Sequence, residues 1–168
     1  MLKGVLEILA TTPEKLKRDI SIFSRREMHA RPAPNKWSVQ EVLAHLADIE
    51  EVGMRARVAA IIEQDNAMLL PVDQEARLVE LKYNTIDPRR SVADFERQRR
   101  ANLKWLRKLR PSQLKRVGVH QEVGEIAAEE LITEWAFHDL GHLKQILEIK
   151  RYALYPRMGS MRTFYELR

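Results

Sequence analysis

Three of the five histidines have the spacing and surroundings of metal ligands. His138 and His142 lie four residues apart, so a helix would place both imidazoles on one face, one turn apart. On a helical wheel that face is an apolar stripe, and His45 lies at the centre of a second apolar stripe in a separate helical stretch. A buried imidazole needs polar partners, which the neighbouring Leu, Val, Ile and Trp side chains cannot supply. One such histidine would indicate a satisfied core residue, but three predict a divalent metal ion bound by His45, His138 and His142.

The ligand set indicates an open catalytic site more than a closed structural one. Three imidazoles without an obvious fourth protein ligand leave a position for water or a substrate. Imidazole suits zinc, nickel, copper or iron, so the ligand type does not select the metal. A di-iron centre is disfavoured because it would need Glu-x-x-His pairs, whereas Val42 and Trp135 stand three residues before His45 and His138.

Polar residues within one turn of the three histidines are candidates for orienting the ligands or moving protons. Asp48, Glu134 and Gln145 hold such positions, and Asp48 and Glu134 are the candidate catalytic carboxylates. Both carboxylates are equally compatible with a solvent-facing helix edge. Asp139 falls toward the edge of its helix by the same wheel. His120 is expected in a surface loop near one end of the molecule, rather than as a fourth ligand.

Four stretches carry the apolar periodicity of helices, and nothing of comparable length alternates like a strand. They are residues 12–29, 38–64, 91–110 and 125–152, the last following Gly124. Thr12 is the expected N-cap of the first, followed by Pro13. In the second, Ser38 and Glu41 form a capping box that leaves Glu41 occupied.

The remaining segments connect and extend these helices. The polar connection 65–88, with a helical piece at 74–82, is long enough to be an active-site lid or a crossover. The apolar tail 155–168 is expected to pack back on the helices. Together these features predict an all-α four-helix bundle in a single domain, residues 1–168, with a long connection between its second and third helices.

Composition narrows the class of protein. The 168 residues are 45% hydrophobic and 32% charged, which suffices for a folded core. No cysteine is present, which excludes disulfides, thiolate metal ligands and a cysteine nucleophile. No apolar run has the length of a membrane span, and residues 2–10 lack a signal-peptide pattern, so a cytoplasmic location is expected. The net charge of +5 is concentrated in residues 89–116, which we interpret as a solvated basic helix rather than a nucleic-acid interface.

Two segments carry a resemblance to a known family. The segment KWSVQEVLAHLAD at 36–48 and the segment EWAFHDLGHLKQI at 134–146, with PRMG at 156–159, resemble the DinB-like family of YfiT-type metal-dependent proteins. The resemblance implies a four-helix bundle with up-down-down-up connectivity. It also implies a nickel or zinc site at His45, His138 and His142, and a homodimer.

The same resemblance suggests an activity. Characterised members include thiol S-transferases that use mycothiol or bacillithiol and a thiol-dependent maleylpyruvate isomerase, while other members have no known activity. The chain is therefore predicted to be a metal-dependent enzyme that acts on a small molecule. It would be either a transferase, with Arg55, Arg57 or the arginines of the third helix binding an anionic thiol, or a hydrolase, with Asp48 or Glu134 as base. The alternative is a non-catalytic stress-response or binding module with a structural metal.

The fourth predicted helix has a second apolar arc opposite the histidines. Its members are Ala136, Phe137, Leu140 and Leu147. A helix that is apolar on two sides is either central in the bundle or part of an interface. We expect this arc to contribute to a homodimer.

Overall fold

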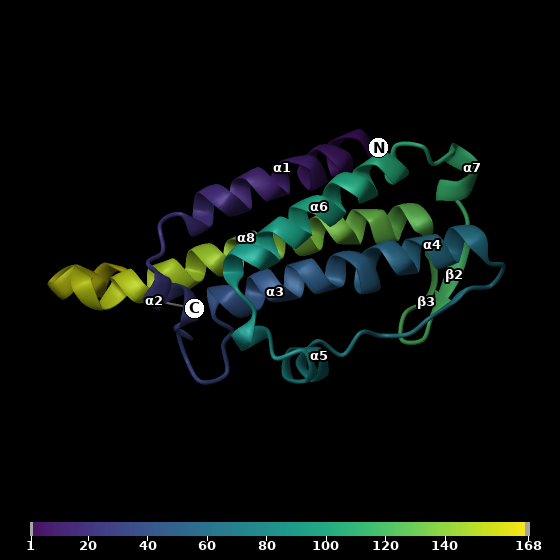
Figure 1. Cartoon of the computed structure of the whole chain (residues 1–168). Helices are drawn as coiled ribbons and strands as arrows, with labels where there is room; N and C mark the ends of the chain where they lie inside the picture. Colours follow the sequence, from purple (N-terminus) through teal and green to yellow (C-terminus); the bar gives the residue numbers. More distant parts are fainter. Residues whose placement is uncertain (1, 167–168) are drawn as a thin grey trace.

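Four helical segments lie side by side along the molecule in the computed structural model, which describes residues 2–166 (Figure 1). The segments are α1 (Leu2–Ile20), α3 (Val39–Ile49) with its continuation, α6 (Pro88–Leu106) and α8 (Ala128–Leu154). The continuation of α3 is a π-helical stretch, η1 (Glu50–Arg55), followed by α4 (Ala56–Glu63). In Figure 1, α1 and α8 run in one direction while α3–α4 and α6 run in the other. This confirms the predicted bundle with up-down-down-up connectivity.

Short elements connect the long helices. They are α2 (Arg25–His29), α5 (Gln74–Glu80), η2 (Tyr83–Thr85), α7 (Pro111–Leu114) and η3 (Tyr155–Phe164), with the strands β1 (Met68–Leu69), β2 (Val117–His120) and β3 (Gly124–Ala127). The connection between α4 and α6 carries β1 and α5 and returns the chain to the other end of the bundle (Figure 1). It is therefore the crossover that its length predicts, with the helical piece where the sequence places it.

A three-stranded sheet at one end of the bundle was not predicted. β1 pairs in parallel with β2, and β2 pairs antiparallel with β3. Gly118 permits the close approach, because a Cβ there would lie 2.9 Å from the carbonyl oxygen of Ala67. Residues 125–127, predicted as the start of the last helix, belong to β3 instead. Strands of two to four residues are too short for an alternating pattern to identify them.

The predicted first helix, residues 12–29, is wrong at its start and in its middle. α1 begins at Leu2 and contains Thr12 and Pro13, and the Thr12 hydroxyl donates to the carbonyl of Ile8 instead of capping the helix. The chain leaves the helix after Ile20, and α2 begins after its own N-cap, Ser24. The capping box predicted at Ser38 and Glu41 is confirmed, with Ser38 N–H donating to Glu41 Oε2 at 2.8 Å.

Pro13 in the middle of α1 leaves the carbonyl of Leu9 without its helical donor, because proline has no N–H. Arg99 of α6 replaces that donor, with Nη1 2.9 Å from the Leu9 oxygen. Both residues are buried. A proline that would ordinarily weaken a helix therefore creates a buried acceptor for a side chain from another helix.

The core consists of two apolar clusters, one toward each end of the bundle. One contains Leu9, Met54, Val58, Leu103, Leu131 and Trp135 among its members; the other contains Leu16, Val42, Leu43, Phe95, Leu143 and Ile146. On α1, α6 and α8 the nearest members of the two clusters are seven or eight residues apart, which is about two turns. The buried Arg99 and Asp139 lie in that interval on α6 and α8, and the buried Glu50 follows Ile49 at the end of α3, so a polar layer divides the core.

Arg99 is the centre of this layer. Its guanidinium forms two hydrogen bonds with Glu50, both at 2.7 Å, and two with Asp139, at 2.5 and 2.9 Å. Each of these three side chains is only 1% exposed. Trp135 and Asn102 donate to the remaining oxygen positions of Glu50, at 3.0 Å each. The wheel position that placed Asp139 at a helix edge is therefore wrong, and the basic segment 89–116 is not solvated throughout.

The C-terminal tail, which contains η3, extends beyond the end of the bundle (Figure 1). The prediction that residues 155–168 pack on the bundle is wrong for the described part, because no side chain of 155–166 is buried. Residues 167 and 168 lie outside the described residues.

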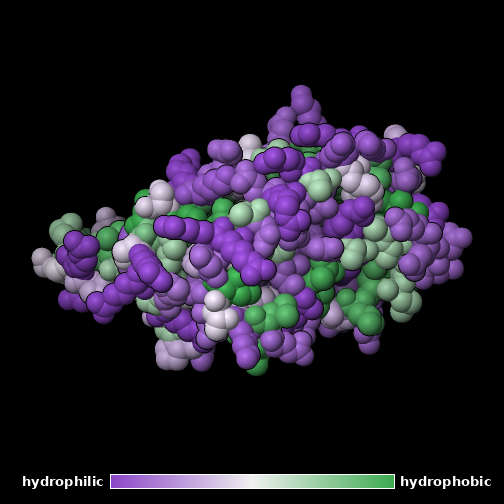
Figure 2. Space-filling model, viewed as in Figure 1, coloured by the Kyte–Doolittle hydropathy of each residue, from purple (hydrophilic) through white to green (hydrophobic). Residues whose placement is uncertain are grey.

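Figure 2 shows apolar patches along the edge that carries α5 and the connection before it. The exposed apolar side chains of that connection are Met68, Leu70, Val79 and Leu81. Within residues 2–166, no helix has both the length and the apolar character that crossing a bilayer requires.

Replacing Arg99 with alanine should lower the free energy of unfolding by about 3–5 kcal/mol, because Glu50 and Asp139 would remain buried without their countercharge. Urea unfolding of the metal-free chain measures this change. Arg100→Ala is the matched control, since the neighbouring Arg100 is 80% exposed and its ion pair with Glu96 should contribute less than about 1 kcal/mol. Equal stabilities of the two variants would contradict the account of the polar layer.

Candidate metal centre

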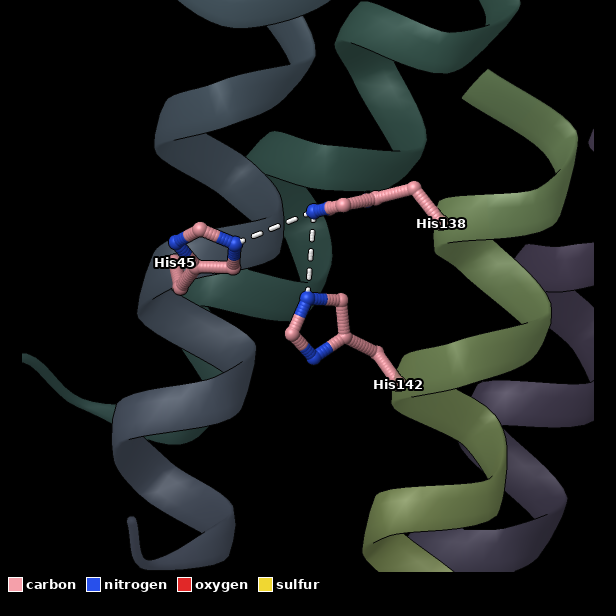
Figure 3. Close-up of side chains that lie close together, drawn as sticks. All are labelled: His45, His138 and His142. Atoms are coloured by element: carbon pink, nitrogen blue, oxygen red, sulfur yellow. Dashed lines mark hydrogen bonds between the residues drawn. The ribbon is translucent and has the colours of Figure 1, made fainter. Parts of the chain in front are cut away.

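The three predicted histidines converge beside the polar layer (Figure 3). His45 comes from α3, and His138 and His142 come from successive turns of α8. Nε2 of His138 lies 3.2 Å from Nε2 of His45 and 3.1 Å from Nε2 of His142. One nitrogen from each ring lies within 4.8 Å of the others, so the three can face a common ion. We call these residues the histidine triad.

Sequence signals in α3 and α8 determine where the members of the triad lie. The Ser38 capping box starts α3 about two turns before His45, and Arg31 forms an ion pair with Glu41 of that box. On α8, the spacing of His138 and His142 brings their rings together on one face. Asp139, adjacent to His138, and Glu50, five residues after His45, both bind Arg99. The buried ion pairs thereby link the two helices that carry the triad.

Burial keeps the triad imidazoles neutral. It lowers the pKa of His45 to about 2, assisted by repulsion from His142, His138 and Arg77. Burial also lowers the pKa of His138 to about 3, with contributions from His142 and Arg99, and it lowers the pKa of His142. A neutral imidazole has one nitrogen lone pair free, which is the form that binds a metal.

The hydrogen bonds around the triad fit a bound cation. Nδ1 of His142 lies 2.8 Å from Oε1 of Gln145, an acceptor, so the proton of the neutral ring is on Nδ1 and Nε2 carries a lone pair. That lone pair faces Nε2 of His138, which also lies against Nε2 of His45, and a single N–H can form only one linear hydrogen bond among these three nitrogens. His45 Nδ1 is buried without a partner. Gln145 holds the orienting position that its spacing predicts, and the converging nitrogens form a donor set suited to a divalent ion.

Aromatic rings enclose one side of the triad. The Trp37 ring lies 5.0 Å from the His45 ring in an edge-on arrangement and stacks with the His142 ring at 6.5 Å. The Tyr83 ring lies 6.3 Å from that of His45. These contacts restrict ring rotation and exclude water from this side, so the rings are held in position without a metal.

Asp48, a candidate catalytic carboxylate, lies away from the triad nitrogens in a network of its own. It accepts two hydrogen bonds from Arg77, at 2.5 and 2.7 Å, and one from the Tyr83 hydroxyl at 2.6 Å. The pKa of Tyr83 is raised by burial and by the charge of Asp48. Because Arg77 belongs to α5, this network connects α5 to α3 next to the rings of Trp37 and Tyr83.

A cavity of about 210 Å³ lies on another side of His138. Glu134, the other candidate carboxylate, lines this cavity, and burial raises its pKa against the opposing charge of Arg57. Arg57, His120 and Gly53 also line the cavity. Gly53 belongs to the π-helical stretch and packs closely against Ile49, because a Cβ on Gly53 would lie 2.7 Å from Ile49 Cγ2. A larger cleft of about 870 Å³ lies between α1, α2 and α6 and includes no triad residue.

The prediction that His120 lies in a surface loop is wrong. His120 is the last residue of β2 and is 9% exposed. Its Nδ1 accepts a hydrogen bond from the Glu122 backbone N–H at 3.2 Å. The missed strand pair explains the error, because only the sheet brings this residue from the end of the bundle to the cavity beside His138. The segment VGVH followed by Gly124, which has a positive φ, is the signal that pointed to a hairpin.

Acidification from pH 7 to pH 5 should destabilise the metal-free chain. The unfolded histidines titrate near pKa 6.5 while the buried rings stay neutral, so the unfolded state binds more protons and stability falls as pH falls. For His45 alone the loss is about 2 kcal/mol over this interval.

Urea unfolding of His45→Gln at the two pH values measures this contribution, and the variant should show about 2 kcal/mol less pH dependence than the unsubstituted chain. His29→Gln is the control, because His29 is exposed at the end of α2 and its loss should leave the pH dependence intact. An unchanged pH dependence in His45→Gln would show that this ring is not held neutral.

Comparison with known proteins agrees with this geometry. The chain is 25% identical over 155 residues to "Putative metal-dependent hydrolase YfiT" of Bacillus subtilis, covering 92% of this chain and 84% of that protein. It is 26% identical over 138 residues to "Putative metal-dependent hydrolase OB0782" of Oceanobacillus iheyensis, covering 82% of this chain and 78% of that protein.

A solved structure shares the fold. It is that of YfiT from Bacillus subtilis, described as "a probable metal-dependent hydrolase with an unusual four-helix bundle topology". It superposes with a TM-score of 0.80 at 23% identity, covering 88% of this chain and 85% of that one. The model of the DinB superfamily matches residues 9–146, which include all three members of the histidine triad. The chain therefore belongs to the DinB superfamily.

Proposed function

We propose that this protein is a metal-dependent enzyme that acts on a small molecule, with zinc or nickel bound by His45, His138 and His142. The observation that carries the proposal is the convergence of three neutral rings, with Nε2 of His138 3.2 Å from Nε2 of His45 and 3.1 Å from Nε2 of His142. Imidazole nitrogens suit both metals. The metal-dependent relatives support the same assignment.

A divalent ion at the triad would supply a Lewis acid that lowers the pKa of a coordinated nucleophile. The chain itself contributes the surroundings of the reaction. Glu134 lines the cavity beside His138 and has a raised pKa, which suits a group that accepts a proton near neutral pH. Asp48 acts as a positioning residue, because it binds Arg77 and Tyr83 and so holds α5 beside the triad.

Hydrolysis is the reaction that this arrangement favours. It needs a carboxylate beside the metal to take the proton of water, and Glu134 lies on the same cavity as His138. The two relatives from Bacillus and Oceanobacillus are both named as hydrolases. The cavity of about 210 Å³ indicates that only a small group of the substrate enters it.

Transfer of a low-molecular-weight thiol is the second candidate. The chain has no cysteine, so a sulfur nucleophile would have to come from a cosubstrate. Arg57 offers a cation in the cavity for an anionic thiol of the bacillithiol type. Turnover of an electrophilic substrate with and without added thiol separates the candidates, because a hydrolase forms product in water alone.

The alternative of a non-catalytic module with a structural metal makes a different prediction about folding. Both apolar clusters and the polar layer are complete without a metal, so the chain treated with a chelator should keep its helical circular dichroism and melt cooperatively. Added zinc should raise the melting temperature, because it binds only the folded state. Loss of the cooperative transition on chelation would instead favour the structural role, in which metal binding supplies the folding free energy.

The metal assignment is tested by His142→Ala. The native chain should bind one zinc or nickel ion, and the variant should bind it at least about 100-fold more weakly, since losing even an outer partner of a ligand costs 10–100-fold. Calorimetric titration and elemental analysis measure affinity and stoichiometry. His29→Ala should retain native binding. Equal affinity of the native chain and His142→Ala would contradict the site.

We also propose that the chain forms a homodimer through α8. Of the predicted apolar arc, Ala136 is buried in the core, whereas Phe137, Leu140 and Leu147 are exposed. Phe137 is 77% exposed, which is a large apolar side chain to leave in water. The resemblance to the family suggests that a second copy of the chain covers these side chains. Light scattering on the native chain and on Phe137→Ser measures how much Phe137 contributes to dimer formation.

A further inference from the structure

Arg57 differs from three other arginines of the bundle in that no carboxylate in the described part of the chain binds it. Arg77, Arg99 and Arg116 each bind a carboxylate with at least one nitrogen at 2.7 Å or less. Among residues 2–166, no hydrogen bond or ion pair joins Arg57 to another side chain, and its Nε is buried without a partner. A buried guanidinium nitrogen that makes no hydrogen bond is costly, so a partner absent from the chain is expected.

No carboxylate among residues 2–166 accepts a hydrogen bond from Arg57. The charge of Arg57 lowers the pKa of Glu134, against the effect of burial, but no ion pair within 4.0 Å joins the two residues. Arg57 thus lines the cavity that it shares with His138 without an ion-pair partner among residues 2–166. The guanidinium presents donors in a fork that matches the two oxygens of a carboxylate.

His120 adds a second donor to the same cavity. Its Nδ1 accepts a hydrogen bond from the Glu122 backbone, so the neutral ring carries its proton on Nε2. No acceptor within the described chain binds that Nε2, and it is not among the buried unpartnered atoms, so it remains accessible. Arg57 and His120 therefore offer donors from two elements, α4 and β2, to one small volume beside His138.

We infer that Arg57 and His120 form a subsite that binds a carboxylate of the substrate while its reacting end lies at the triad. A carboxylate is favoured over a phosphate, because Glu134 and Glu122 line the cavity and repel a dianion more strongly than a monoanion. The inference rests on the proposed function and adds the substrate class: a small carboxylic acid, or a thiol that bears a carboxylate.

The subsite is tested with the cobalt-loaded chain and two thiols that differ only in charge, 3-mercaptopropionate and its neutral amide. Absorption from the cobalt–sulfur bond reports the binding of each thiol. The carboxylate should bind about tenfold more tightly than the amide, and Arg57→Gln should remove most of that preference. Arg55, a thiol-binding candidate in the sequence, does not line this cavity and instead stacks on Trp105, with its guanidinium carbon 3.5 Å from the ring centroid. Arg55→Gln is therefore the matched control on the same helical segment. It should keep the native preference.

A metal-free measurement separates failure of the subsite from failure of the metal centre. In the 15N-labelled chain without metal, propionate should shift the Arg57 Nε–H resonance saturably and leave that of Arg55 unmoved. Saturation at Arg57 together with a failure to bind cobalt would overturn the proposed function alone. An unresponsive Arg57, or a preference for the carboxylate that survives in Arg57→Gln, would overturn the subsite whether or not cobalt binds.

Discussion

One buried guanidinium contacts all four long helical segments. Arg99 belongs to α6 and binds the Leu9 carbonyl of α1, the Glu50 carboxylate at the end of α3 and the Asp139 carboxylate of α8. Apolar side chains alone tolerate shifts along a helix axis, whereas these hydrogen bonds require one register. A buried ion pair is weak evidence for stability, so we assign this network mainly to specifying how the helices align.

The alignment determines whether the histidines can meet. Glu50 follows His45 by five residues, and Asp139 adjoins His138, so holding both carboxylates on one guanidinium holds the two helices that carry the triad at matching heights. A slip of one turn, about 5.4 Å, would separate the Nε2 atoms that now lie 3.1–3.2 Å apart. The polar layer and the histidine triad are therefore adjacent parts of a single polar region between two apolar clusters.

The sequence was sufficient for the bundle and for the convergence of the triad, because long amphipathic helices repeat their signal over several turns. It failed where a contact between distant segments overrides a local rule. Pro13 predicts a helix start, yet it lies inside α1, where Arg99 satisfies the carbonyl that it leaves free. Asp139 predicts an exposed edge, yet its charge is buried against that same arginine. His120 was misplaced because β2 pairs with β1, about 50 residues earlier in the chain, as well as with its neighbour β3, and the first of these contacts has no local signal.

The central claim, a metal ion at the histidine triad, is tested most directly by anomalous diffraction from crystals of the zinc- or nickel-loaded chain. We expect one strong anomalous peak at about 2.0–2.1 Å from the Nε2 atoms of His45, His138 and His142. A fully loaded crystal whose anomalous peak lies elsewhere, with the three rings turned apart, would contradict it.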